Sequence, residues 1–167
     1  MLIMGIDPGI AISGFGFVEG KDNGYTVVEY GVIKTDTNLS IPQRLKCIYK
    51  GYLDLMRKYK PDAIAVEELF YNKNAKTIIT VGQARGVAIL AASLLNIEVF
   101  EYTPLQVKQA VVGYGRADKH QVQEMIRVLL HLDSIPKPDD AADALAAALC
   151  HLNSSRINSL FNSAKRF

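Results

Sequence analysis

The sequence has no tryptophan, only two cysteines and no hydrophobic run long enough to cross a membrane. Cys47 and Cys150 lie far apart, without a CxxC pair or a Cys/His cluster, so neither a structural zinc site nor a disulfide framework is expected. The longest apolar run, Val87–Leu95, contains Ser93 and is far shorter than the roughly 20 residues of a spanning helix. We therefore expect a protein of the reducing cytoplasm that does not span a membrane.

A strong excess of one charge is also missing. Lys and Arg number 19 and Asp and Glu 17, a formal net charge of +2, whereas nucleic-acid-binding domains are typically strongly basic.

The apolar start, Met1–Ile6, has no basic lead and meets Asp7 at once, which does not fit a signal peptide. The length of 167 residues and the globular composition predict one domain over residues 1–152. Residues 153–167, rich in Asn and Ser, are predicted to form a loose tail.

Turn signals separate three β-branched or aromatic segments near the start of the chain. Leu2–Asp7, Ile12–Glu19 and Tyr25–Thr35 are therefore predicted to be consecutive antiparallel strands. Helix-start patterns, with Ser or Thr and a Gln three residues later, stand at Ser40 and Thr103. In chain order we expect a helix to Lys60, a strand over 63–68, a helix over 74–96, a strand over 97–102, and helices after Thr103, over 118–132 and over 139–151. This order predicts an α/β protein with a mixed five-stranded sheet flanked by helices.

Four acids occupy positions where an acid is costly. Asp7 and Glu67 each end an apolar strand, and Asp140 and Asp143 open a helix that is otherwise rich in Ala and Leu. If the first and fourth strands are parallel neighbours, Asp7 and Glu67 meet at the edge of the sheet where α/β proteins collect their ligands. The two helical acids are three residues apart and share a face.

Converging carboxylates repel one another unless cations hold them together. Ligands that are all oxygen favour hard ions such as Mg²⁺, with Mn²⁺ as a substitute. Two such ions about 4 Å apart serve phosphodiester displacement, one activating water and the other stabilising the leaving oxygen. Each acid also has an ordinary interpretation. Asp7 is a turn former, Asp139 and Asp140 are helix caps, and Glu68 rather than Glu67 is the inward residue if the strand phase is reversed.

Basic and aromatic residues occur in two stretches that contain no acid, Tyr71–Arg85 and Tyr102–Ala117. Such stretches suit phosphate contacts, and aromatics in loops stack on unpaired bases, although a solvated face and core packing are the ordinary alternatives. Lys119 begins a helix, where the dipole disfavours a cation, which hints at a functional lysine. The candidate DNA contacts are Phe70, Tyr71, Lys73, Lys76, Arg85, Lys108, Arg116 and Lys119.

Five motifs, taken together and in order, resemble the RuvC family of bacterial Holliday-junction resolvases over about residues 2–150. The motifs are Gly5-Ile6-Asp7-Pro8-Gly9, Ala65-Val66-Glu67-Glu68-Leu69-Phe70, Gly82-Gln83-Ala84-Arg85-Gly86-Val87-Ala88, Gln106-Val107-Lys108-Gln109 with Val111-Val112-Gly113, and Asp140-Ala141-Ala142-Asp143-Ala144-Leu145-Ala146. The first motif alone is shared with other enzymes, whereas the whole set is specific. Asp140 stands where some relatives carry His.

The resemblance implies a ribonuclease H-like fold and a homodimeric, Mg²⁺-dependent endonuclease that nicks two opposed strands of a four-way DNA junction during recombination and repair. It implies Asp7, Glu67, Asp140 and Asp143 as catalytic metal ligands, with Lys119 as a catalytic cation. It also implies a role for Lys108, base contact by Phe70, a dimer contact through the helix 74–96, and the RuvA–RuvB branch-migration complex as a partner.

Three other readings of the same residues remain. A related ribonuclease H-like nuclease would act on other branched or RNA substrates. A non-catalytic DNA-binding protein would keep the fold but lack part of the carboxylate set, which is complete here. A phosphotransferase of the sugar-kinase and actin-like superfamily shares the Asp-x-Gly turn, but it needs two lobes where this length supplies one.

Overall fold

One mixed sheet forms the centre of the computed structural model, which describes residues 1–21, 24–69 and 75–164. Within these residues the sheet has five strands in the spatial order β3-β2-β1-β4-β5. The strands are β1 (Leu2–Asp7), β2 (Ile12–Lys21), β3 (Gly24–Lys34), β4 (Ala63–Glu67) and β5 (Glu98–Tyr102). The first three are antiparallel neighbours, and β4 and β5 continue the sheet parallel to β1. The predicted class and strand number are confirmed for the described part of the chain.

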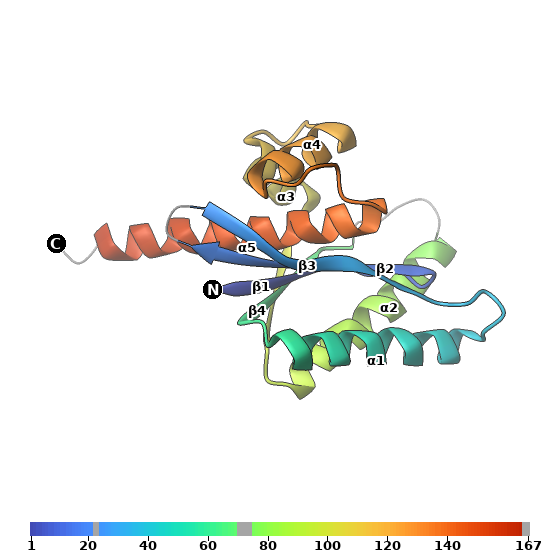
Figure 1. Cartoon of the computed structure of the whole chain (residues 1–167). Coiled ribbons are helices and arrows are strands. Elements are labelled where there is room, and N and C mark those ends of the chain that lie inside the picture. The colour runs from blue at the N-terminus through green and yellow to red at the C-terminus, as the bar shows by residue number, and fades with distance from the viewer. Residues whose placement is uncertain (22–23, 70–74, 165–167) are drawn as a thin grey trace.

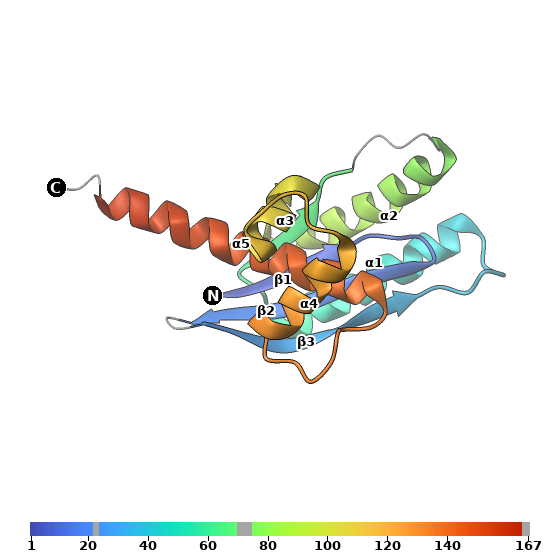
Figure 2. The same ribbon diagram turned by 90° about the horizontal axis from the view of Figure 1, so that it is seen from above.

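Helices cover both faces of this sheet, as Figure 1 shows. α1 (Ile41–Tyr59) and α2 (Ala75–Leu94) pack on one face, and α5 (Asp139–Ala164) crosses the other. α3 (Pro104–Val112) and α4 (Lys119–Leu129) lie over α5, which therefore runs between them and the sheet (Figures 1 and 2). None of the described helices is both long and apolar enough to span a membrane.

The predicted helix starts are confirmed by their capping geometry. The side chain of Thr103 accepts a hydrogen bond from the backbone N–H of Gln106 at 3.2 Å, and the Gln106 side chain accepts one from the Thr103 N–H at 2.8 Å. Asp118 forms the same reciprocal pair with Gln121, at 2.9 Å in both directions. Such boxes satisfy backbone donors that the first helical turn leaves without partners. They fix where α3 and α4 begin, and therefore where Lys119 stands.

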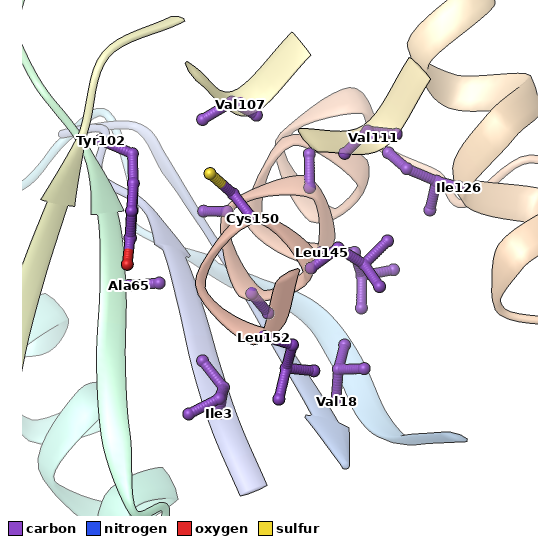
Figure 3. Packing of buried hydrophobic residues seen from close by; sticks show 14 of the residues in the cluster. Ile3, Val18, Ala65, Tyr102, Val107, Val111, Ile126, Leu145, Cys150 and Leu152 are labelled. Atoms are coloured by element: carbon purple, nitrogen blue, oxygen red, sulfur yellow. The ribbon is translucent and has the colours of Figure 1, made fainter. Parts of the chain in front are cut away.

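α5 lies unusually close to β1 and β2 because small residues meet at the contact. A Cβ added to Gly5 would stand 1.8 Å from the carbonyl oxygen of Ala144, and one added to Gly14 would stand 1.9 Å from that of Asp140. Only glycine permits such an approach of a helix backbone to a strand. Larger side chains, labelled in Figure 3 as Ile3, Val18, Leu145 and Leu152, fill the remaining space.

The predicted end of the last helix, at His151, is wrong. α5 continues to Ala164, so the segment predicted as the beginning of a loose tail is helical. Polar side chains near the beginning of this segment contact other elements of the fold. Asn153 accepts a hydrogen bond from the hydroxyl of Tyr25 and donates one to the carbonyl of Ala110 at 2.8 Å. Composition suggested a tail because it does not reveal that these polar groups have partners on other elements.

Candidate active site

Two of the predicted acids meet at one edge of the sheet. β1 and β4 are parallel neighbours in which Ile6 pairs with Val66, so Asp7 and Glu67 follow at adjacent strand ends. Both side chains are half-buried, since the strands before them are enclosed by helices on both faces. The predicted juxtaposition of the two strand ends is confirmed. On the other side, Asp7 pairs in the antiparallel register with Gly14 of β2.

The remaining two predicted acids come from the first turns of α5. Asp140 and Asp143 sit among fully buried alanines, and the close contact with Gly5 and Gly14 holds this part of the helix against the sheet. The electrostatic field of both acids reaches Asp7, where each raises the pKa of the carboxyl group. The fold therefore brings all four predicted carboxylates within mutual influence.

Lys119 lies at the same place and is held by two acids. Its ammonium group stands 3.1 Å from Oδ2 of Asp143 and 3.0 Å from Oδ2 of Asp139. Burial alone lowers the pKa of Lys119, but the two carboxylates outweigh it and raise the pKa above its ordinary value. The lysine therefore remains a cation beside the acids, in agreement with its predicted position at the beginning of α4.

The carboxylates in this cleft resist ionisation. Burial is the largest cause that raises the pKa of Asp7 from 3.8 to about 7, followed by the charges of Asp143, Asp140 and Glu67, whereas Lys119 lowers it. Burial also raises the pKa of Glu67, with a further contribution from Asp143 and an opposing one from Lys108. The pKa of Asp143 is raised by burial against the opposing charge of Lys119. Such raised values are typical of functional sites.

A single cavity joins these groups to solvent. It is lined by the two strand-end acids, by Asp143 and by two lysines, together with apolar residues of α2, α3 and α4. Lys108 of α3 and Lys119 of α4 both line it, whereas Asp140 is not among its lining residues. The cavity residues are Asp7, Pro8, Glu67, Glu68, Leu69, Val81, Pro104, Val107, Lys108, Lys119, Val122, Asp143 and Ala146.

The other predicted DNA contacts are distributed unevenly. Arg116 is exposed in the loop between α3 and α4, next to the cavity helices. Arg85 does not line the cavity. Its guanidinium is 2.7 Å from a carboxylate oxygen of Glu101, and its side chain is only 15% exposed. This ion pair joins α2 to β5. Phe70, Tyr71, Lys73 and the side chain of Lys76 lie outside the described residues.

Sequence reasoning missed three supporting residues. Asp139 was considered only as a helix cap, yet it binds Lys119 and accepts a hydrogen bond from Gln123 at 3.0 Å. Ser13 and Tyr52 are both fully buried, and Tyr52 lies near enough to Asp7 and Asp140 to feel their charges. A serine within an apolar strand is a signal for Ser13, whereas Tyr52 looks like any other member of the apolar stripe of its helix.

The donor set fits hard divalent cations. Every candidate ligand is a carboxylate oxygen, and the mutual repulsion that raises the pKa of Asp7 is what a bound cation would relieve. Within residues 1–21, 24–69 and 75–164, no three acidic, histidine or cysteine side chains already stand at ligand spacing. The chemistry of the donors, rather than a preformed cage, is therefore the basis of the fit.

Comparisons with known proteins agree with this architecture. The family model described as "Crossover junction endodeoxyribonuclease RuvC" matches residues 3–151. A curated protein of that name from Alkaliphilus metalliredigens is 58% identical over 161 residues, covering 96% of this chain and 98% of the relative. Another from Caldanaerobacter subterraneus is 57% identical over 157 residues, covering 94% and 95%. The solved structure of T. thermophilus RuvC in complex with Holliday junction substrate has a TM-score of 0.91 at 36% identity, covering 95% of this chain and 96% of that one.

The sheet order and the helices on its two faces define a ribonuclease H-like nuclease fold. Within that class, the chain belongs to the RuvC family of crossover junction endodeoxyribonucleases. The predicted family, fold and nuclease class are confirmed.

Proposed function

We propose that this protein resolves four-way DNA junctions in recombination and repair by paired, symmetric nicks in two opposed strands, using Mg²⁺ held by Asp7, Glu67, Asp140 and Asp143. The observation that carries the proposal is the convergence of three of these acids and two lysines on one cavity, with the charge of Asp140 acting on Asp7. Mn²⁺ fits the same oxygen donors. Divalent ions bound to such acids activate a water molecule and stabilise the leaving oxygen in phosphodiester hydrolysis.

The carboxylates supply the negative charge that holds the ions at the sheet edge. Asp7 is the central ligand, because its carboxyl group is influenced by all three other acids. Glu67 and Asp143 would help to hold the ions, from β4 and α5 respectively, and Asp140 would be a further ligand or would orient the attacking water. A carboxyl group whose pKa is about 7 releases its proton readily when a cation arrives near neutral pH.

The lysines act on the DNA side of the cavity. Lys119 is half exposed and points its ammonium at the acids, where it offsets the charge that develops on the reacting phosphate. Lys108 lies beside Glu67 and binds a neighbouring phosphate of the same strand. Arg116, exposed nearby, extends this basic surface, and the sequence prediction adds Phe70, Tyr71, Lys73 and Lys76 as contacts to the opened bases and backbone.

A dimer through α2 provides the second cut. The outward face of α2 carries Ile79, Leu90 and Leu94, which are 62%, 51% and 59% exposed, with Gly86 between them. An apolar helix face of this kind fits a second copy of the chain, because paired cuts in a two-fold junction require two equivalent sites. Family membership is the support for a cytoplasmic location and for association with the RuvA–RuvB complex.

The proposal is tested with a synthetic mobile four-way junction labelled on each strand in turn. We expect the protein to nick two opposed strands symmetrically with Mg²⁺ and to bind without nicking in EDTA. Asp7→Asn is expected to bind the junction normally while cleaving about 10³-fold more slowly, since it removes a central charged group. Cleavage in EDTA, or full activity of Asp7→Asn, would contradict the metal-carboxylate site.

The matched control is Asp54→Asn, which makes the same chemical change at an exposed acid of α1, away from the cavity. It is expected to cleave at the wild-type rate. A junction replaced by linear duplex of the same length should be bound weakly and left intact by all three proteins. Cutting of the duplex at a comparable rate would contradict junction specificity but leave the metal site standing.

A further inference from the structure

A buried hydroxyl group lies near Asp7 and Asp140 and has no part in the mechanism above. Tyr52 of α1 is fully buried, and its hydroxyl donates a hydrogen bond to the carbonyl of Gly14 at 3.0 Å. The same hydroxyl lies within hydrogen-bonding reach of Ser13 and feels the charges of Asp7 and Asp140. Burial and these charges raise the pKa of Tyr52 far above its ordinary value, so it remains a neutral donor.

Ser13, the second member of this group, closes the turn that follows Asp7. Its hydroxyl donates a hydrogen bond to the carbonyl of Gly9 at 2.7 Å and accepts one from the Gly9 N–H at 3.2 Å. Ser13 is fully buried and comes from β2, whereas Gly9 belongs to the connection after β1. The side chain therefore fixes the path of the backbone just beyond the first catalytic acid.

Gly14 connects both hydroxyl groups to the acids. It is the antiparallel partner of Asp7 in the sheet, and its α-carbon faces the backbone of Asp140, because an added Cβ would meet the Asp140 carbonyl oxygen at 1.9 Å. A displacement of Gly14 would therefore shift Asp7 through the strand pairing and Asp140 through direct contact. The hydrogen bond from Tyr52 holds this residue in place from the opposite face of the sheet.

We propose that Tyr52 and Ser13 are positioning residues of the catalytic centre, which hold Gly14 and Gly9 so that Asp7 and Asp140 keep the spacing needed for their shared ions. This inference rests on the proposed carboxylate site. Ordinary core packing would require only the ring of Tyr52, as it requires only the apolar side chains of its neighbours Ile48 and Met56. The hydroxyl is needed because the Gly14 carbonyl would otherwise lose a buried hydrogen bond.

The first test is Tyr52→Phe, which keeps the ring and removes the hydroxyl. Single-turnover cleavage of saturating junction is expected to fall about tenfold, because small displacements of catalytic groups are costly. Junction affinity in EDTA should remain within about twofold of wild type, since no DNA-facing group changes. Mn²⁺ binding to the DNA-free protein, measured by calorimetry, should weaken about tenfold, as expected when a group that orients metal ligands is removed.

The control is Tyr102→Phe, which removes another buried hydroxyl, the one 2.7 Å from Nδ1 of His151 on the α5 side of the sheet. It is expected to lower the midpoint of thermal unfolding without changing Mn²⁺ affinity. If Tyr52→Phe behaves in the same way, with lost stability but an unchanged cleavage rate and Mn²⁺ affinity, the positioning role is wrong and the hydroxyl is only structural.

Ser13 provides an independent test should Tyr52→Phe fail to fold. Ser13→Ala is expected to reproduce the loss of rate and of Mn²⁺ affinity, and Ser13→Thr, which keeps a hydroxyl, to restore most of both. In the double variant with Tyr52→Phe the losses should not add, because both hydroxyls act through the same backbone segment. Equal behaviour of the Ala and Thr variants would overturn the inference. An inactive Asp7→Asn beside unaffected Tyr52 and Ser13 variants would refute the positioning role alone, whereas a fully active Asp7→Asn would refute the site itself.

Discussion

The two faces of the sheet are packed in different ways. On the face covered by α5, glycines of β1 and β2 meet an alanine-rich helix, and backbone touches backbone. On the face covered by α1 and α2, the contact is made by larger side chains such as Phe17, Ile48, Tyr52 and Met56. Backbone contact leaves little freedom of position, whereas long side chains can repack around a disturbance.

This difference corresponds to a division of tasks. α5 carries Asp140 and Asp143, whose distances from Asp7 the proposed metal site requires to be constant, and its backbone closely approaches β1 and β2. α2 carries no acid, and its outward side keeps large apolar residues at the surface. In the proposed mechanism the face covered by α5, which we call the rigid face, sets the geometry of the reaction. The face covered by α1 and α2 is available for the proposed second copy.

The largest effect is expected from a single methyl group on the rigid face. Gly5→Ala places a Cβ where the Ala144 carbonyl oxygen and the Ala148 nitrogen stand, so α5 must move away from β1. We expect a loss of about 4 kcal/mol or more in unfolding free energy, in the range of severe packing and strain defects. Cleavage by protein that remains folded should fall at least about 100-fold, because the α5 acids leave their positions. Urea unfolding and single-turnover cleavage measure the two effects.

The same methyl group on the other face provides the comparison. Gly51→Ala in α1 meets only side-chain atoms of Ile33, the nearest at 2.8 Å, which can rotate away. The gain in helix propensity, about 1 kcal/mol, then offsets most of the repacking cost. Its unfolding free energy should remain within about 1 kcal/mol of wild type, with unchanged cleavage. Equal damage from the two substitutions would show that the faces do not differ in rigidity.

An intermediate effect is expected from the acids that the rigid face brings together. In EDTA, folded Asp7 titrates near pH 7 but near pH 3.8 when unfolded, so between these values the folded state binds more protons. The unfolding free energy should therefore fall as pH rises from about 4 to about 7, by on the order of 3 kcal/mol from this group. Asp7→Asn should flatten that decline and be the more stable protein at pH 8.

Mg²⁺ supplies the complementary measurement. Because the ion requires the deprotonated carboxylate, its stabilising effect on the wild type should increase from pH 6 to pH 8. Asp7→Asn should show a smaller stabilisation with little dependence on pH. A decline in stability with pH that is as steep in Asp7→Asn as in the wild type would mean that burial and repulsion at Asp7 do not control it.

Much of the fold followed from local patterns. The element order and the capped starts at Thr103 and Asp118 were predictable, because they depend on residues near one another in the chain. The acids were identifiable because charge is costly at the end of an apolar strand or within an alanine-rich helix. The role of Gly14 was not predictable, since it depends on a contact with a helix more than a hundred residues later. For the same reason the length of α5 was not predictable, because Asn153 and Arg156 form hydrogen bonds to residues distant in sequence, Ala110 and Tyr25 respectively.

The pairing of Arg85 shows a further limit of sequence reasoning. Arg85 lies in an acid-free stretch and was predicted to contact DNA, but the sequence did not reveal its ion pair with Glu101, which lies on a strand separated from it in sequence. Charge counted along the chain cannot reveal an ion pair across the fold. The same limit applied to Asp139, whose distance to Lys119 is set by the packing of α4 on α5.

The smallest effect on monomer stability is expected on the outward side of α2. Leu90 is 51% exposed, so Leu90→Lys should change the unfolding free energy of the monomer by no more than about 0.5 kcal/mol. In the proposed dimer, however, the lysine would be buried against its symmetry mate, and sedimentation should show conversion to monomers. The control is Val128→Lys on α4, the helix that lies over α5 on the opposite face of the sheet from α2 (Figure 1). Val128 is 52% exposed, and its substitution should leave the assembly unchanged. If Leu90→Lys sediments like the wild type and still makes paired cuts, the second copy does not bind through α2.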